Sequence, residues 1–79
     1  MPKTTGGNRD NKIRLLAIER MLSKDRYISS AQIITRLDLI YDIQVDRKTV
    51  YADLIAIERF IPLDVKCGKY GGYRILDNV

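Results

Sequence analysis

The sequence predicts a small α+β domain in which three helices precede a β-hairpin. Three observations lead to this prediction. Apolar residues recur at helical spacing in three separate segments that end near Phe60. Pro62 then stops the helical pattern, and residues 63–67 alternate between apolar and polar as a strand does. The glycine-rich segment 68–72 supplies a turn, so the following residues can return antiparallel to the first strand.

The size and composition of the chain narrow the classes of function. Its 79 residues form one small domain, too small for a large enclosed active site. Fourteen Lys and Arg against ten Asp and Glu give a formal net charge of +4, which suits a polyanionic partner. The single Cys67 excludes an intrachain disulfide, and the absence of His removes the usual zinc ligand sets. We therefore expect no metal, no cofactor and no small-molecule site in this chain.

The sequence also bears on where the protein acts. No apolar run approaches the roughly 18 residues that span a bilayer, and the first residues lack the apolar core of a signal peptide. We therefore expect no membrane partner and a cytoplasmic location.

The first predicted helix follows a polar segment. Residues 1–9 are rich in Gly and Thr, which predicts a flexible N-terminal arm before a folded domain over residues 10–77. The helix should run from Asn11 to about Lys24. It is apolar on almost every side, with Leu15, Ile18, Met21 and Leu22 on one face and Ile13, Leu16 and Ala17 beside it. Either both sides pack inside the domain, or Ile13 and Leu16 contact a partner subunit.

A short extended segment, residues 27–29, leads into the second predicted helix. Ser29 or Ser30 can cap a helix that begins at Ala31. Its core stripe reads Ile33 or Ile34, then Leu37, then Ile40 or Tyr41, and it ends near Asp42. Because a two-stranded ribbon is marginal alone, we expect Tyr27 and Ile28 to pair with the hairpin as a third strand.

The third predicted helix, residues 46–60, has two distinct faces. Asp46 can cap it by accepting a hydrogen bond from the backbone N–H of Lys48 or Thr49. The core face carries Val50, Leu54, Ile57 and Ile61 at helical spacing. The opposite face is mostly small or cationic and comprises Lys48, Thr49, Tyr51, Ala52, Ile55, Ala56 and Arg59.

The charges at the start of this helix point to an anionic partner. Arg47 and Lys48 lie in the first turn, where the helix macrodipole disfavours an exposed cation by about 0.3–1 kcal/mol. Local stability does not explain them. A phosphate would, because cations and free backbone N–H groups at a helix start together bind anions.

The hairpin completes the fold. Leu63, Val65 and Cys67 should point inward, Cys67 as a small core hydrophobe, and residues 73–76 should form the return strand. The order helix, strand, helix, helix, strand, strand is that of a winged helix-turn-helix, with three helices and a small antiparallel β-hairpin wing.

The chain resembles the N-terminal winged helix-turn-helix domain of bacterial transcription regulators of the DeoR-like and WYL-domain type. The resemblance covers about Asn11 to Leu76 and is carried by Arg47-Lys48-Thr49-Val50-Tyr51-Ala52-Asp53-Leu54, then Leu63-Asp64-Val65, then Gly71-Gly72-Tyr73-Arg74. It implies sequence-specific binding of double-stranded DNA, usually as a homodimer, in transcription control.

The chain also departs from the family pattern. Ala52 stands where the pattern commonly has Arg, and the connection between Leu37 and Val45 is longer than in the short form of the motif. The sequence stops just beyond the wing, so we expect either a module of a larger regulator or a small stand-alone one.

The predicted DNA contacts fall on the second helix start, the third helix and the wing. They are Ser30, Arg47, Lys48, Thr49, Tyr51, Ala52, Lys66, Lys69, Tyr70 and Arg74. Arg47 can bond guanine bidentately and Lys48 can meet a phosphate. Thr49 contacts a thymine methyl or a phosphate, or completes the cap. Tyr51 bonds a phosphate or props two helices, and Ser30 caps its helix, meets a phosphate, or does both.

The wing, residues 66–74, has two interpretations. It can contact the flanking backbone or minor groove, or its lysines can serve solubility alone. The sequence contains no pattern of a nucleophile with a nearby base that differs from ordinary charged surface residues, so we do not expect an enzyme.

The leading hypothesis is a nucleoid-associated DNA-binding transcription regulator. The alternative is a winged-helix protein-interaction adaptor without direct DNA readout. It is motivated by Ala52 and by the surplus apolar residues Ile13, Leu16, Ile40, Ile55 and Phe60.

Overall fold

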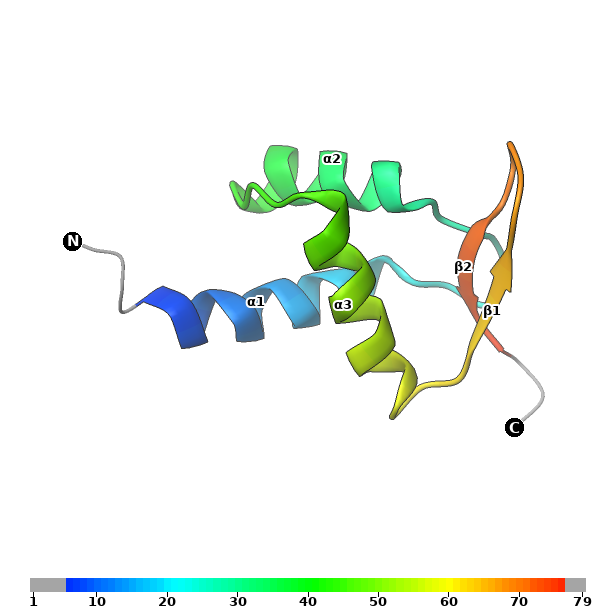
Figure 1. The fold of residues 1–79 in the computed structure, drawn as a ribbon, viewed down its shortest axis with the longest axis horizontal. Helices are drawn as coiled ribbons and strands as arrows, with labels where there is room; N and C mark the ends of the chain where they lie inside the picture. Colours follow the sequence, from blue (N-terminus) through cyan, green and yellow to red (C-terminus); the bar gives the residue numbers. More distant parts are fainter. Residues whose placement is uncertain (1–5, 77–79) are drawn as a thin grey trace.

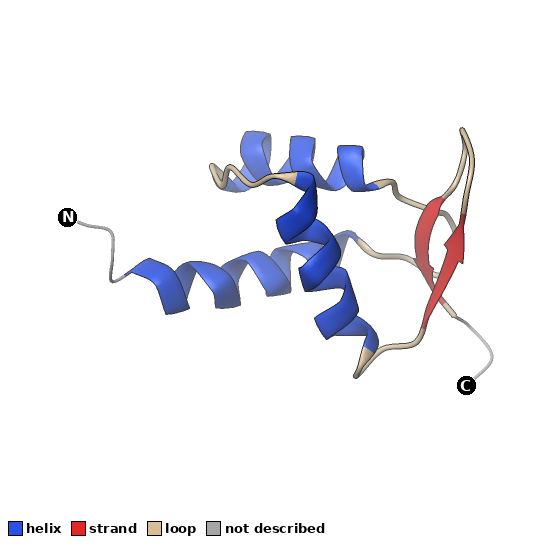
Figure 2. Cartoon of the chain, in the orientation of Figure 1, coloured by secondary structure: helices blue, strands red, loops and turns tan. Residues whose placement is uncertain are grey.

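The computed structural model describes residues 6–76, with side chains described from Asn11 onward. Its elements are α1 (Gly6–Met21), α2 (Ser30–Tyr41), α3 (Arg47–Glu58), β1 (Leu63–Lys66) and β2 (Gly72–Ile75). The helices α1 and α2 pack side by side, α3 packs across both, and the hairpin stands at one end of the helices (Figures 1 and 2). This arrangement confirms the predicted α+β fold with the layout of a winged helix.

The bounds of α1 differ from the prediction at both ends. The helix begins at Gly6 rather than Asn11, so residues 6–9, which we assigned to the arm, are helical; residues 1–5 and 77 lie outside the described part. Once a helix has formed, each added residue gains a hydrogen bond, which offsets the low propensity of glycine. The helix ends at Met21 rather than Lys24. Beyond it the Ser23 hydroxyl accepts a hydrogen bond from the Asp25 N–H at 2.9 Å, a turn that competes with helix.

A capping box starts α2 and a left-handed residue ends it. The Ser29 hydroxyl accepts from the Gln32 N–H at 3.1 Å, and the Gln32 side chain accepts from the Ser29 N–H at 3.0 Å. Of the two predicted caps Ser29 is therefore the one used, and the helix begins at Ser30. After Tyr41 the backbone of Asp42 adopts φ 58°, which stops the helix.

The core lies where the three helices meet the base of the hairpin. Its buried residues are Ala17, Ile18, Leu22, Ile28, Ile33, Leu37, Val50, Leu54, Ile57 and Leu63. The predicted core face of α3 is thus confirmed for Val50, Leu54 and Ile57. The predicted stripe of α2 is wrong at its end, since Ile40 and Tyr41 are exposed. Ile43 and Val45, from the connection that follows, pack against the core instead.

The hairpin is tied to the α1–α2 connection by backbone hydrogen bonds, one of which runs from the Ile75 N–H to the Ser23 carbonyl at 2.8 Å. Strands β1 and β2 are antiparallel, with Leu63 opposite Ile75 and Lys66 opposite Gly72. The third strand is reduced to a single bridge, in which Ile28 and Tyr73 exchange N–H···O bonds of 2.9 and 2.8 Å. A Cβ on Gly72, whose φ is +147°, would lie 2.3 Å from the Ile28 carbonyl oxygen. Glycine therefore permits this close approach.

Only the base of the hairpin is covered. Leu63 is buried, whereas Val65 and Cys67 are exposed. The prediction that Cys67 fills the core is therefore wrong. Alternation along a strand points a residue toward the core only where another element covers that face, and Leu63 is the one residue of β1 that is buried.

Candidate nucleic-acid interface

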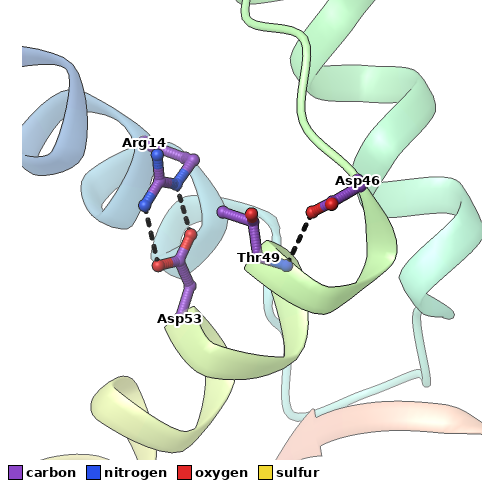
Figure 3. Close-up of polar contacts among 4 residues, drawn as sticks. All are labelled: Arg14, Asp46, Thr49 and Asp53. Carbon is purple, nitrogen blue, oxygen red and sulfur yellow. Dashed lines mark hydrogen bonds and ion pairs between the residues drawn. The ribbon is translucent and has the colours of Figure 1, made fainter. Parts of the chain in front are cut away.

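The helix α3 is held in place by an ion pair with α1. The Arg14 guanidinium binds both carboxylate oxygens of Asp53, through Nε to Oδ2 and through Nη2 to Oδ1 at 3.0 Å (Figure 3). Asp53 is only 7% exposed, and among the residues whose side chains are described it is the one charged residue that is buried. Because the bidentate pair joins the middle of α3 to α1, it sets which face of α3 points outward.

The sequence analysis did not predict this ion pair. The spacing could have indicated it, because Asp53 falls among Val50, Leu54 and Ile57 on the core face of an amphipathic helix. A carboxylate at such a position requires a buried cationic partner. The local sequence around Asp53 does not identify Arg14 as that partner, because the two residues are 39 positions apart in the chain.

The outward face of α3 is open to solvent. Lys48, Ala52, Ile55 and Arg59 are all exposed, and their spacing of four, three and four residues places them along one side of the helix axis. Among residues 11–76, whose side chains the structure describes, no hydrogen bond or ion pair joins Arg47, Lys48 or Arg59 to another side chain. The cations at both ends of this face are thus available to an anionic partner.

The start of α3 is built by Asp46 and Thr49. The Asp46 carboxylate accepts from the Thr49 N–H at 2.9 Å (Figure 3). Hydrogen bonding from Thr49, through its side chain and then its backbone, lowers the pKa of Asp46 below the ordinary 3.8. Thr49 is half-buried and takes part in the cap, which was one of its predicted roles. Contact of Thr49 with DNA stays a prediction.

The hairpin runs back alongside α3 (Figure 1). A shallow apolar groove lies between the two. It is lined by Tyr51, Leu54, Ile55, Glu58, Leu63 and Tyr73. Tyr51 stands at this groove with its side chain partly exposed, so it faces the hairpin while remaining accessible from outside. Both of its predicted roles, prop and phosphate contact, are compatible with this place.

The base of the wing uses its cations internally. Lys66 Nζ and Arg74 Cζ lie 5.5 and 5.2 Å from the centroid of the Tyr27 ring. Arg74 also pairs with Asp64 at 2.9 Å and donates to the Lys24 carbonyl at 3.0 Å. The Tyr27 hydroxyl donates to Asp64 at 2.6 Å, and this bond lowers the pKa of Asp64. We call Tyr27, Asp64, Lys66 and Arg74 the wing-base cluster.

The remaining predicted residues lie at the wing tip and at the start of α2. Lys69 and Tyr70 are exposed at the tip, with Lys69 Nζ 5.7 Å from the Tyr70 ring centroid. Ser30 is partly buried as the first residue of α2, at the end of that helix nearest the hairpin (Figure 1). Four of the predicted residues thus lie together on α3, namely Arg47, Lys48, Tyr51 and Ala52. Lys69 and Tyr70 lie apart from them at the wing tip. Arg74 is held by Asp64 and by the Lys24 carbonyl.

Comparisons of the chain with protein-family models, with curated proteins and with solved structures found no match. The side chains described, those of residues 11–76, contain no cluster of three or more Cys, Asp or Glu that could hold a metal ion. In the same part of the chain no helix combines the length and apolar content needed to cross a membrane.

Proposed function

We propose that this protein binds double-stranded DNA sequence-specifically and regulates transcription in the bacterial cytoplasm, in the manner of the DeoR-like and WYL-domain regulators that its sequence resembles. In this proposal α3 enters the major groove and the wing follows the flanking backbone or minor groove. The observation that carries it is the exposed start and outward face of α3, where Arg47, Lys48 and Arg59 form no ion pair with any side chain of residues 11–76.

Two of these cations lower the stability of the helix that carries them. Arg47 and Lys48 stand in the first turn of α3, where the macrodipole disfavours them. A phosphate placed there would bond both the cations and the free backbone N–H groups of the turn. An α-helix of ordinary width fits the major groove, where a guanidinium can pair with guanine. We assign Arg47 to base contact, Lys48 to a phosphate, and Lys69 and Tyr70 to the flanking backbone.

The wing-base cluster has a supporting role in this proposal. Lys66 and Arg74 stack over Tyr27, and Arg74 pairs with Asp64. Their charges hold the hairpin against the α1–α2 connection, so they position the tip and contribute less to DNA contact than their charge alone would suggest.

The experiment is selection of bound duplexes from a random pool, followed by affinity measurements over a range of salt concentrations. We expect log affinity to fall linearly with log salt, by about 0.9 per phosphate neutralised. A variant carrying Arg47→Ala and Lys48→Ala should bind the selected duplex at least about tenfold more weakly. The charge-matched control, Lys12→Ala with Arg20→Ala on α1, should bind nearly normally. Equal losses in both variants, or an affinity independent of salt, would contradict the proposal.

A second candidate function, protein interaction, is favoured by one further surface. A groove between α1 and the end of α3 is lined by Leu15, Leu16, Glu19, Ala56, Ile57, Phe60 and Ile61. Leu16 is 61% exposed and Phe60 is 88% exposed, more than a monomer needs at adjoining positions. The occupant that we propose is a second copy of the chain. In a two-fold pairing, Phe60 of each copy would enter the other's groove and cover its exposed apolar lining.

Sedimentation over a range of protein concentrations tests this pairing. We expect a concentration-dependent shift from monomer to dimer that Phe60→Ala removes and that Leu39→Ala, on exposed α2 surface, leaves unchanged. A protein that stays monomeric throughout would contradict a homodimer through this groove.

A further inference from the structure

The outward face of α3 has a feature that phosphate contacts do not explain. Along the row Lys48, Ala52, Ile55 and Arg59, the two ends are cationic and the two middle residues are apolar. Ile55 is 66% exposed, although Val50, Leu54 and Ile57 on the same helix are buried in the core. A large aliphatic side chain therefore stands in the middle of the face that we propose to meet DNA.

These middle residues cannot recognise polar base edges. The side chains of Ala52 and Ile55 neither donate nor accept hydrogen bonds, so they cannot pair with the N7, O6, O4 or exocyclic amino groups in the major groove. One major-groove feature suits them, which is a methyl group on C5 of a pyrimidine. Thymine carries that group, and 5-methylcytosine carries the same group at the same place.

The geometry of α3 allows both residues to approach such groups. Ala52 and Ile55 are three residues apart and therefore neighbours on the helix surface, with Cβ atoms about 5–6 Å apart. The small Ala52 lets the helix backbone come close to the bases, while Ile55 reaches further. Lys48 and Arg59 lie one turn beyond on either side, where they can hold phosphates on both flanks of the contact.

We infer that α3 recognises pyrimidine C5-methyl groups through Ala52 and Ile55, so that its preferred site has thymine in the centre of the contacted segment. The inference rests on the proposed DNA-binding function and names the chemistry of its specificity. Burial of one methyl group contributes about 0.8 kcal/mol, so each recognised methyl is expected to change affinity about fourfold.

The test uses duplexes selected by the wild-type protein, in which each thymine is replaced in turn by uracil, which differs only in lacking the methyl group. Wild-type protein should bind about fourfold more weakly when a recognised thymine is replaced. The Ile55→Ala variant should bind the thymine and uracil duplexes almost equally at the position that Ile55 contacts. The Leu39→Ala variant, which shortens an aliphatic side chain that is 77% exposed on α2, should keep the wild-type ratio.

A second arm separates the two sources of the methyl group. Replacing a recognised thymine–adenine pair by 5-methylcytosine–guanine should retain more affinity than replacing it by cytosine–guanine. Three results would overturn the inference while leaving DNA binding intact: equal wild-type affinity for all thymine and uracil duplexes, an unchanged ratio in Ile55→Ala, and equal affinity for cytosine and 5-methylcytosine. Failure to select any duplex would overturn the proposed function itself.

Discussion

The cations of α3 and the cations that tie the fold together have opposite environments. Arg14 and Arg74 are each held by a carboxylate, Asp53 and Asp64 respectively, from a different element. Arg47, Lys48 and Arg59 are exposed and form no ion pair with the side chains described, those of residues 11–76. The same chemical groups thus serve two purposes. Cations that lie where two elements meet form ion pairs that join those elements. Cations on the solvent-facing side of α3 are accessible to a binding partner.

This comparison also bears on which residues we propose as DNA contacts. Charge alone placed Arg74 and Lys66 with Arg47 and Lys48 as candidates, whereas the structure shows that the first two stack over Tyr27. We therefore propose α3 and the wing tip, rather than the base of the wing, as the main DNA contacts. The difference between the two sets of cations should appear directly in stability measurements, with large losses for the internal set and almost none for the outward set.

The largest loss of stability is expected for Asp53→Ala. The substitution leaves the Arg14 guanidinium, whose side chain is only 14% exposed, without its carboxylate. Removal of one member of a buried pair typically costs about 3 kcal/mol or more. Urea denaturation measures the change. As a control, Arg14→Met combined with Asp53→Leu removes both charges and should recover a large part of the loss. If Asp53→Ala unfolded at the wild-type urea concentration, the ion pair would not anchor α3.

A smaller loss is expected at the wing-base cluster, and it should depend on pH. The hydrogen bond from Tyr27 is the main cause of the lowered pKa of Asp64, ahead of the charge of Arg74. A carboxyl whose folded pKa lies below its unfolded value stabilises the fold above the unfolded pKa, near 3.8, and this contribution disappears as the pH falls through the folded pKa.

Tyr27→Phe removes that hydrogen bond. The variant should unfold at lower urea concentration than wild type at neutral pH. The difference should shrink as the pH falls through the lowered folded pKa of Asp64, because Asp64 is protonated in both proteins below that pKa. Tyr41→Phe, at an exposed position on α2, should match wild type throughout. A difference between Tyr27→Phe and wild type that did not change with pH would show that the hydroxyl acts independently of the Asp64 charge.

The smallest effect is expected for Arg47→Ala combined with Lys48→Ala. Surface substitutions away from such contacts change stability by about 0.5 kcal/mol or less, and removing two cations from the start of a helix relieves the unfavourable macrodipole interaction. Thermal unfolding followed by circular dichroism should therefore give a midpoint equal to or slightly above that of wild type. A clear drop would mean that these cations hold the fold, and the proposed DNA contact would lose its main support.

Local chemistry in the sequence was enough to predict most of the elements. Serine before α2, Asp46 before α3 and Pro62 after it act on backbone groups a few residues away, so their effect can be read without a structure. The core face of α3 follows for the same reason, since helical spacing places Val50, Leu54 and Ile57 on one side whatever they pack against. The cationic start of α3 was likewise evident from the sequence.

The tertiary structure alone decided which groups pair and which surfaces stay uncovered. The partner of Asp53 lies 39 residues away, and Arg74 bonds a carbonyl 50 residues away. No periodicity encodes such pairs, because they depend on how separate elements cross. The exposure of Cys67, Ile40 and Tyr41 also depends on how the elements pack. A strand or helix pattern indicates which residues share a face. Only packing determines where along that face the covering element ends.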